Sequence, residues 1–267
     1  VMGVSAYLVS LALMIALIVD ALSDPLIGYL SDNTRSRWGR RHPFMYAAAL
    51  PAAIAYYFVW NPPSGLEGDA LFPYIVTIAV VVRTLVTVYE IPSSSLVAEM
   101  SDDYDERTSM LSYRYFFGWT GGTLMGAFAT IFILVPTTTI SNGMFNVQGH
   151  GQVGAIAAMV IFVAMIVSTM GTHKMIPDLK APPPPRRMTV GLIYREVFET
   201  LASRSFLALF LAALFGAVAA GVSTTLNFYF STFFWGFTTE QIGLISLSVV
   251  ISALLAFFIA PIISKKL

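Results

Sequence analysis

Apolar residues fill seven long stretches of the chain, and short polar segments separate them. An α-helix needs about 20 apolar residues to cross the hydrocarbon core of a bilayer, which is roughly 30 Å thick. The stretches of sufficient length are approximately 2–30, 43–60, 71–98, 108–135, 151–172, 205–231 and 241–263. The pattern therefore predicts an all-α membrane protein with seven transmembrane helices.

The connections between these stretches alternate in charge. Every Lys and Arg except Arg83 and Arg114 falls in segments 31–43, 99–107 and 173–204 or at the C-terminal end. Cytoplasmic loops are enriched in Lys and Arg, so these connections are predicted to lie in the cytoplasm. Residue 1 then lies outside, and the odd number of helices suggests that one helix precedes this chain and that others follow it.

The composition fits a chain that is embedded in lipid. Charged residues make up 11% of the chain and hydrophobic residues 57%, whereas soluble domains carry about 25% charged residues. The formal net charge is zero and no basic tail is present, which argues against a nucleic-acid partner. Cysteine is absent, which excludes disulfides and thiolate metal sites within this chain.

Segment 173–204 is the longest polar connection and divides the chain. Its second half has apolar residues at helical spacing, Leu192, Ile193, Val197 and Leu201. We expect an amphipathic helix on the cytoplasmic face, and a linker helix packed against the bundle is the alternative. The predicted units are an N-terminal helical bundle (1–172), a central linker (173–204) and the start of a C-terminal bundle (205–267).

Charged residues at membrane depth cost about 2.5–3.5 kcal/mol each on insertion scales and mark functional sites. Asp20 and Asp24 are four residues apart, so they share one face of the first helix. Together with Ser23 they offer hard oxygen ligands, which suit Na⁺ or a proton. The alternative is that basic partners or lipid headgroups neutralise both carboxylates.

A second group of polar residues follows on the third and fourth predicted helices. Arg83, Thr87 and Glu90 have i, i+4, i+7 spacing and share one helix face. Glu90 and Arg114 lie at similar depths, roughly 12 Å from the cytoplasmic side, and can meet the acidic pair in one layer. An arginine and a carboxylate that face a cavity can bind the hydroxyl groups of a polyol. A structural Glu90–Arg114 ion pair is the alternative, and both interpretations can hold together.

The segment GYLSDNTRSRWGRR, residues 28–41, is the most specific string. Glycine permits close helix approach at the membrane edge. A topology signal would require only positive charge, without an acid and glycines at fixed positions. We therefore expect a cytoplasmic gate formed by Gly28, Asp32, Arg37, Gly39, Arg40 and Arg41.

Two blocks of sequence resemble the glycoside–pentoside–hexuronide cation symporters, the melibiose-permease family within the major facilitator superfamily. DALSDPLIGYLSDNTRSRWGRRHP (20–43) resembles the second span and following loop of that family, and TVYEIPSSSLVAEMSDDYDERTSMLSYRYFF (87–117) resembles the fourth span to the start of the fifth. The resemblance is weaker up to residue 172, and beyond it only the topology matches. It implies an incomplete major facilitator bundle, with spans two to eight of twelve.

The resemblance also implies roles for individual residues. The cation site, which would bind Na⁺ if sodium is the coupling ion, would consist of Asp20, Ser23, Asp24 and Thr87. The substrate would bind Glu90 and Arg114, and we add Arg83 because it shares the face of Glu90. Two departures from the family concern the substrate: Ser94 replaces an aromatic residue, and a glutamate replaces the aspartate at position 90.

The implied function is Na⁺- or H⁺-coupled symport of a sugar or glycoside by alternating access. We expect a monomer in the bacterial inner membrane that contacts lipid and needs no cofactor beyond the coupling ion. A carrier of lysolipids or other organic solutes is one alternative. A seven-span ligand-sensing receptor is another, although it leaves the deep carboxylates unexplained. An enzyme is not expected, because the histidines, His42, His150 and His173, all lie at helix ends.

Overall fold

The computed structural model describes residues 3–138, 140–179 and 189–264, and the regular elements of this part of the chain are all helical. The long elements are α1 (Ala6–Asn33), α2 (His42–Trp60), α3 (Phe72–Met100), α4 (Tyr104–Phe128), α5 (Val147–His173), α6 (Val190–Leu201), α7 (Arg204–Tyr229) and α8 (Thr239–Ser264). Short turns of 3-10 helix are η1 (Gly68–Leu71), η3 (Gly143–Phe145) and η4 (Ile176–Asp178). Turns of π-helix, η2 (Ala129–Ile133) and η5 (Phe230–Phe234), extend α4 and α7.

Six helices in the described part of the chain are long and apolar enough to cross a membrane, namely α1 to α5 and α7 with their short extensions. The seventh predicted stretch, 241–263, forms α8, in which Thr239–Ser252 is a shorter apolar helix. The predicted all-α membrane fold is therefore confirmed. The predicted amphipathic helix within 190–204 is α6, which ends at Leu201.

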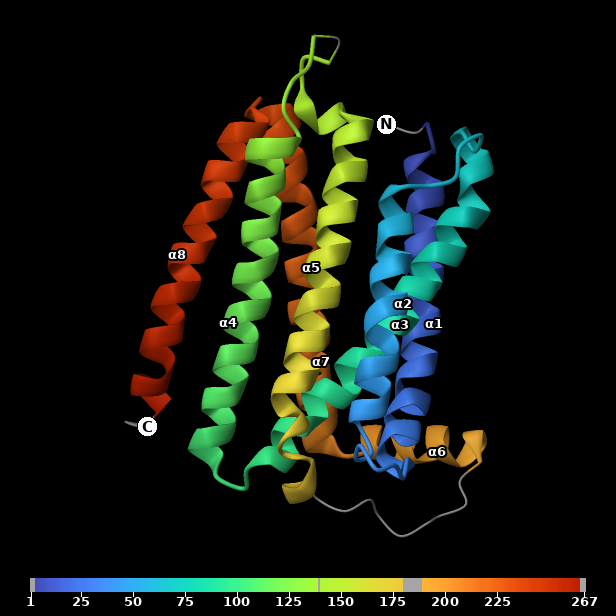
Figure 1. Cartoon of the computed structure of the whole chain (residues 1–267), viewed down its shortest axis with the longest axis vertical. Helices are drawn as coiled ribbons and strands as arrows, with labels where there is room; N and C mark the ends of the chain where they lie inside the picture. Colours follow the sequence, from blue (N-terminus) through green and yellow to red (C-terminus); the bar gives the residue numbers. More distant parts are fainter. Residues whose placement is uncertain (1–2, 139, 180–188, 265–267) are drawn as a thin grey trace.

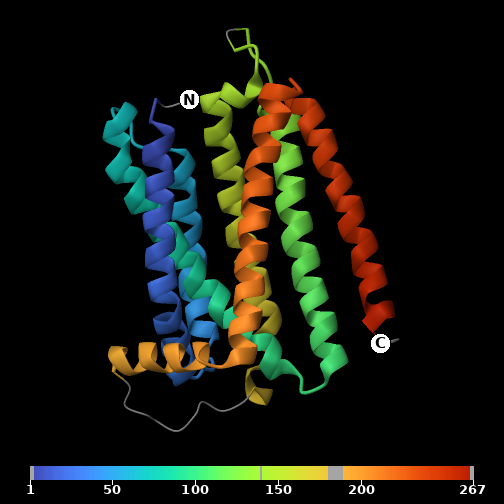
Figure 2. The ribbon, with the colours of Figure 1, turned by 180° about the vertical axis from the view of Figure 1, so that it is seen from behind.

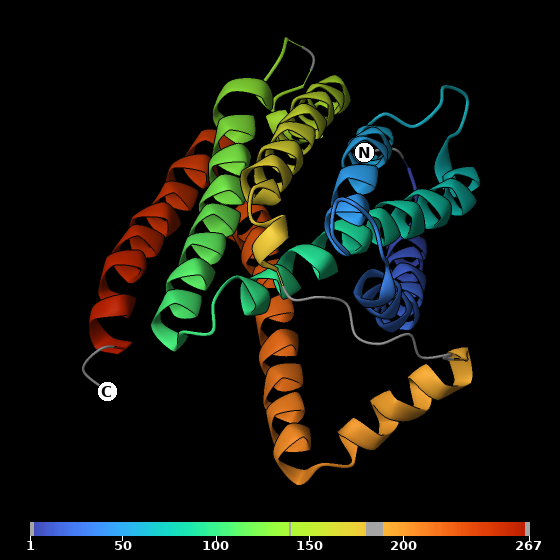
Figure 3. The same ribbon diagram turned by 60° about the horizontal axis from the view of Figure 1, so that its bottom comes forward.

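The long helices stand side by side in two groups that α3 connects (Figure 1). Helices α1 and α2 pack on α3, α5 packs on α2, and α4 packs on α8. Helix α3 crosses the bundle obliquely, from the upper end of α1 and α2 to the lower end of α4 (Figures 1 and 3). It therefore brings polar residues from its middle and lower turns toward both groups.

Helix α6 lies across the lower end of the bundle, nearly perpendicular to the other helices (Figures 1 and 2). It packs against α1, where the Tyr194 hydroxyl donates a hydrogen bond to the backbone carbonyl of Leu22. The Thr189 hydroxyl caps its first turn by accepting from the Leu192 amide. The linker helix is thus both horizontal and packed on the bundle, so the two interpretations of segment 190–204 are compatible.

The α2–α5 contact depends on small side chains. Ala48, Ala49 and Ala52 of α2 are almost fully buried, and Met165 of α5 joins this core. Small residues let helix backbones approach closely, which is how helices gain packing energy where lipid is the solvent. At the other end of α5, a side chain at Gly154 would overlap Trp60 of α2, whose ring stacks on His150 with centroids 5.6 Å apart.

The first prediction concerns the seam between α2 and α5, that is, the packed contact of these two helices. Gly154→Ala is expected to destabilise the fold by about 1–3 kcal/mol, because the new methyl group would collide with the Trp60 side chain. Gly171→Ala on the same helix is the matched control, since nothing lies within 4 Å of its added carbon. Thermal unfolding in detergent, followed by tryptophan fluorescence, measures both. Equal melting temperatures for the two variants would show that the α2–α5 seam is not tightly packed.

Candidate functional site

Asp20 is the centre of a buried polar cluster between α1 and α3. The residue is only 9% exposed, and both of its carboxylate oxygens have partners. The Thr87 hydroxyl donates to Oδ1 over 2.8 Å, and the Arg83 guanidinium donates to Oδ2 through Nε, at 3.0 Å, and Nη2. Arg83 and Thr87 are one helical turn apart on α3, so a single face of that helix reaches both oxygens.

Asp24 lies one turn further along α1, on the same side. Its Oδ1 atom is buried and has no hydrogen-bond partner among the described residues. Asp20, Arg83 and Glu90 act on it electrostatically, and the Thr87 hydroxyl lies between the two acids. A buried carboxylate oxygen without a partner is costly unless a proton or a cation joins it. Ser23 donates its hydroxyl to the Asp20 backbone carbonyl, over 3.1 Å, which leaves the lone pairs of its oxygen available.

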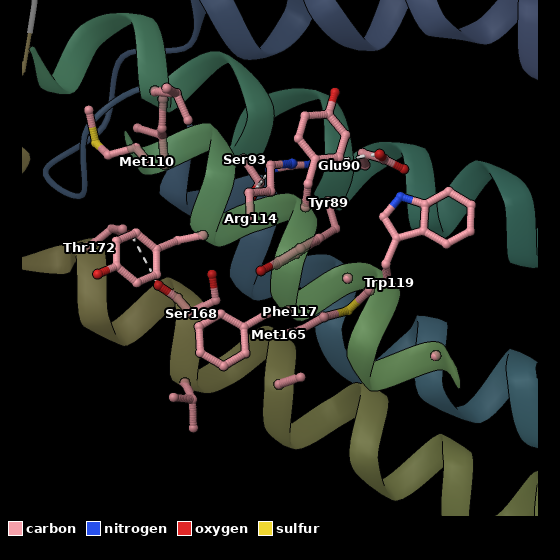
Figure 4. A pocket seen from close by; sticks show the side chains of 18 of the residues that line it. Tyr89, Glu90, Ser93, Met110, Arg114, Phe117, Trp119, Met165, Ser168 and Thr172 are labelled. Atoms are coloured by element: carbon pink, nitrogen blue, oxygen red, sulfur yellow. Dashed lines mark hydrogen bonds and ion pairs between the residues drawn. The ribbon is translucent and has the colours of Figure 1, made fainter. Parts of the chain in front are cut away.

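Glu90 and Arg114 meet at the wall of a large cavity between α3, α4 and α5. Their charged groups are 3.6 Å apart, and Arg114 also donates to the Ser93 hydroxyl over 3.1 Å. The cavity has a volume of about 1340 Å³. Figure 4 shows Glu90, Ser93 and Arg114 together with Ser168 and Thr172 from α5. The predicted pairing of Glu90 with Arg114 is therefore present in the structure.

The rest of the cavity wall is mainly apolar and aromatic. Its large side chains include Met45, Tyr89, Met110, Tyr113, Phe117, Trp119 and Met165. The Glu90 side chain is 63% exposed, so it is open to the cavity and retains free oxygen lone pairs. Such a cavity offers two kinds of contact. The charged pair can bind hydroxyl groups, and the aromatic wall can pack against the flat apolar face of a ring or against an alkyl group.

Arg83 is placed differently from the other residues that were assigned to the substrate. Its guanidinium lies on Asp20, and its side chain lines a second cavity of about 560 Å³ with Tyr56, Tyr74 and His150. The oblique path of α3 explains this position: the upper turns of α3 face α1 and α2, whereas the lower turns face α4. Arg83 therefore belongs to the acidic cluster, and its role toward a substrate stays a prediction.

The segment 28–41 forms a charged cluster at the lower end of the bundle. Asp32 pairs with Arg41 at 3.0 Å, and Arg37 lies over the Trp38 ring, 5.7 Å from its centroid. Gly39 has φ +74°, a conformation that favours glycine, in the turn before α2. At Gly28 an added carbon would reach ordinary contact with Ile91, at 3.7 Å.

Glu99 joins this cluster and was not predicted. It is buried at the lower end of α3 and accepts hydrogen bonds from Arg40, over 2.6 Å, and from Arg41. A glutamate in the last turn of a helix faces the negative end of the helix dipole, so it needs a basic partner. That unfavourable position was the signal in the sequence that could have identified it.

With six apolar helices of sufficient length among the described residues, the chain is a multi-pass membrane protein, and its buried acids and its large open cavity with a charged pair are typical of a membrane transporter. The sequence matches the profile of the family described as MFS/sugar transport protein over residues 1–267, and the chain belongs to this family. The resemblance stated from the sequence is thus confirmed. No comparison supports a seven-span receptor.

Individual relatives are symporters and sugar transporters by name. The uncharacterized symporter sll1374 of Synechocystis is 33% identical over 64% of this chain and 31% of its own length. The isoprimeverose transporter of Lactiplantibacillus pentosus is 29% identical over 63% of the chain and 35% of its own length. Sodium-dependent lysophosphatidylcholine symporter 1 of Mus musculus is 33% identical over 39% of the chain and 20% of its own length. The chain thus spans about a third of the length of the first two relatives.

The second prediction tests the charged cluster at the lower end. Glu99→Ala is expected to destabilise the fold by about 3 kcal/mol, because it leaves two partly buried arginines short of a partner. Glu199→Ala removes an exposed i, i+4 partner of Arg195 on α6 and should cost at most about 0.5 kcal/mol. Thermal unfolding in detergent compares the two. A loss at Glu99 no larger than that at Glu199 would show that the cluster does not hold α3 to the 34–41 loop.

Proposed function

We propose that the protein containing this chain is a secondary active transporter that couples the movement of a monovalent cation, Na⁺ or H⁺, to that of an organic solute. The observation that carries the proposal is the pair of acids on α1 next to the cavity that holds Glu90 and Arg114. The cation would bind Asp20, Ser23, Asp24 and Thr87. The solute would bind Glu90 and Arg114.

The coupling between the two sites follows from their common helix. Thr87 contacts Asp20, whereas Glu90, three residues later on α3, reaches into the large cavity. A cation that orders the α1–α3 contact would therefore also orient Glu90, and would raise solute affinity. By linkage, the solute would raise cation affinity by the same factor.

We infer that the solute is a sugar or glycoside, since the Glu90–Arg114 pair and the aromatic wall suit hydroxyl groups on an apolar ring. The isoprimeverose transporter among the relatives supports this class. The largely apolar cavity, with the lysophosphatidylcholine symporter as a relative, favours a lysolipid as the second candidate. In both cases the protein would act as a monomer surrounded by lipid.

Alternating access would require the lower end to open and close. The cluster of Asp32, Arg40, Arg41 and Glu99 ties the 34–41 loop to the lower end of α3. We propose that it is a gate on the predicted cytoplasmic side, and that it separates when access changes. The proposed motion is a rocking of two helical groups about the binding sites.

The third prediction tests the cation site. Asp24→Asn should abolish the stimulation of solute uptake by an imposed cation gradient, because the amide can neither carry the exchangeable proton nor offer an anionic ligand. Uptake by the protein in liposomes, with a sodium or a proton gradient, measures this. Asp178→Asn, which changes an exposed acid outside the helices of the site, should behave like the wild type. Gradient-dependent uptake that survives in Asp24→Asn would remove the assignment.

The fourth prediction concerns the solute site. Glu90→Gln and Arg114→Gln should each weaken solute binding about tenfold to a hundredfold, which corresponds to the loss of one charge-assisted hydrogen bond. Uptake of labelled disaccharides and of a lysophosphatidylcholine distinguishes the two substrate classes. Glu199→Gln, on the exposed face of α6, is the control. Unchanged half-saturation for every solute in both variants would show that the ion pair is only structural.

A further inference from the structure

Arg83 forms an ion pair with Asp20. Two of its guanidinium nitrogens donate to Oδ2, and the Thr87 hydroxyl donates to Oδ1, so both oxygens of this carboxylate are engaged. On the other acid, Oδ1 of Asp24 has no partner within the described residues. The positive charge at the cluster is therefore supplied from within the chain, and it is placed on one of the two acids.

The charges of the cluster show what this guanidinium does. Without Arg83, the two acids on α1 would present two negative charges in a low dielectric, with Glu90 adding a third nearby. Arg83 reduces the charge of the pair to one, and it removes one of the two carboxylates from the available ligands. The side chain thus weakens the attraction of the site for any external cation.

The surroundings of Arg83 allow it to leave. Its side chain is 43% exposed, in contrast to the 12% of Asp20. It lines the cavity of about 560 Å³, whose wall is mainly apolar and also includes Tyr56, Tyr74 and His150. A guanidinium released from Asp20 therefore has open space beside it into which the side chain can turn.

We propose that Arg83 is a tethered competitor of the coupling cation at Asp20 and is the residue that sets how tightly the site binds Na⁺. The proposal rests on the proposed function, since it assumes that Asp20 and Asp24 bind the cation. Cation binding displaces the guanidinium into the second cavity, and cation release lets it return. Arg83 is then a specificity-determining residue of the cation site and no part of the solute site.

The test measures binding of Na⁺ itself, as a titration of tryptophan fluorescence or of bound ²²Na⁺, in the protein in detergent. Arg83→Gln should raise sodium affinity by about tenfold or more, because a full positive charge within a few ångströms of the ion is removed. Arg83→Lys keeps the charge and should remain close to the wild type. Arg195→Gln, which changes an exposed arginine on α6, is the matched control. Sodium affinity that is unchanged or weaker in Arg83→Gln would overturn the proposal.

A chemical rescue distinguishes the effect of losing the positive charge at residue 83 from an effect of the substitution on folding. The chain contains no cysteine, so the thiol introduced by Arg83→Cys can be modified selectively in this chain. A cationic aminoethyl methanethiosulfonate reagent should bring the raised sodium affinity back toward the wild type, whereas a neutral methyl reagent should leave it high. Equal effects of the two reagents would contradict a role for the charge.

The outcome is independent of the test of the proposed function. If Asp24→Asn keeps its cation response, the cation site itself is misassigned. If Asp24→Asn loses that response while Arg83→Gln binds Na⁺ as the wild type does, only the role of Arg83 fails.

Discussion

The pairing of Asp20 with Arg83 and Thr87 is the interaction on which the arrangement of the first helices depends. A charge at membrane depth is tolerated only when another group compensates it. Here Asp20 of α1 is compensated by Arg83 and Thr87 on one face of α3, and this requirement fixes which faces of α1 and α3 meet. Along the oblique course of α3, Arg83 and Thr87 meet Asp20 on α1, while Glu90 and Glu99 further down meet other partners.

Helix α3 thereby links three sites along one element. Thr87 contacts the acidic pair, Glu90 contacts Arg114 in the large cavity, and Glu99 contacts the arginines of the 34–41 loop. Neighbouring sites are at most about two and a half helical turns apart. A rotation of α3 about its axis that breaks the contact of Thr87 also displaces Glu90, because the two residues are in the same helical turn. The proposed coupling of ion, solute and gate therefore needs no long chain of intermediates.

Local spacing explains how much of this could be predicted from the sequence. The lengths of the apolar stretches predicted the helices, and the i, i+4 and i+7 rules placed Asp20 with Asp24 and Thr87 with Glu90 on common faces. Equal depth below the membrane surface predicted the pairing of Glu90 with Arg114. What spacing cannot supply is the rotation and tilt of one helix against another. Arg83 was therefore grouped with Glu90 although it points to α1, and Glu99 was missed because its partners are 58 and 59 residues away.

The hydrogen bond from Tyr194 to the Leu22 carbonyl joins the horizontal helix α6 to α1 one residue before Ser23. Only two residues separate α6 from α7, so the bond lies close to the start of the helices that follow the linker. A single hydrogen bond contributes only about 1 kcal/mol, which thermal motion can break and remake. The contact is thus too weak to fix α6 to the bundle. It is weak enough to form and break as the helices that follow the linker move relative to α1.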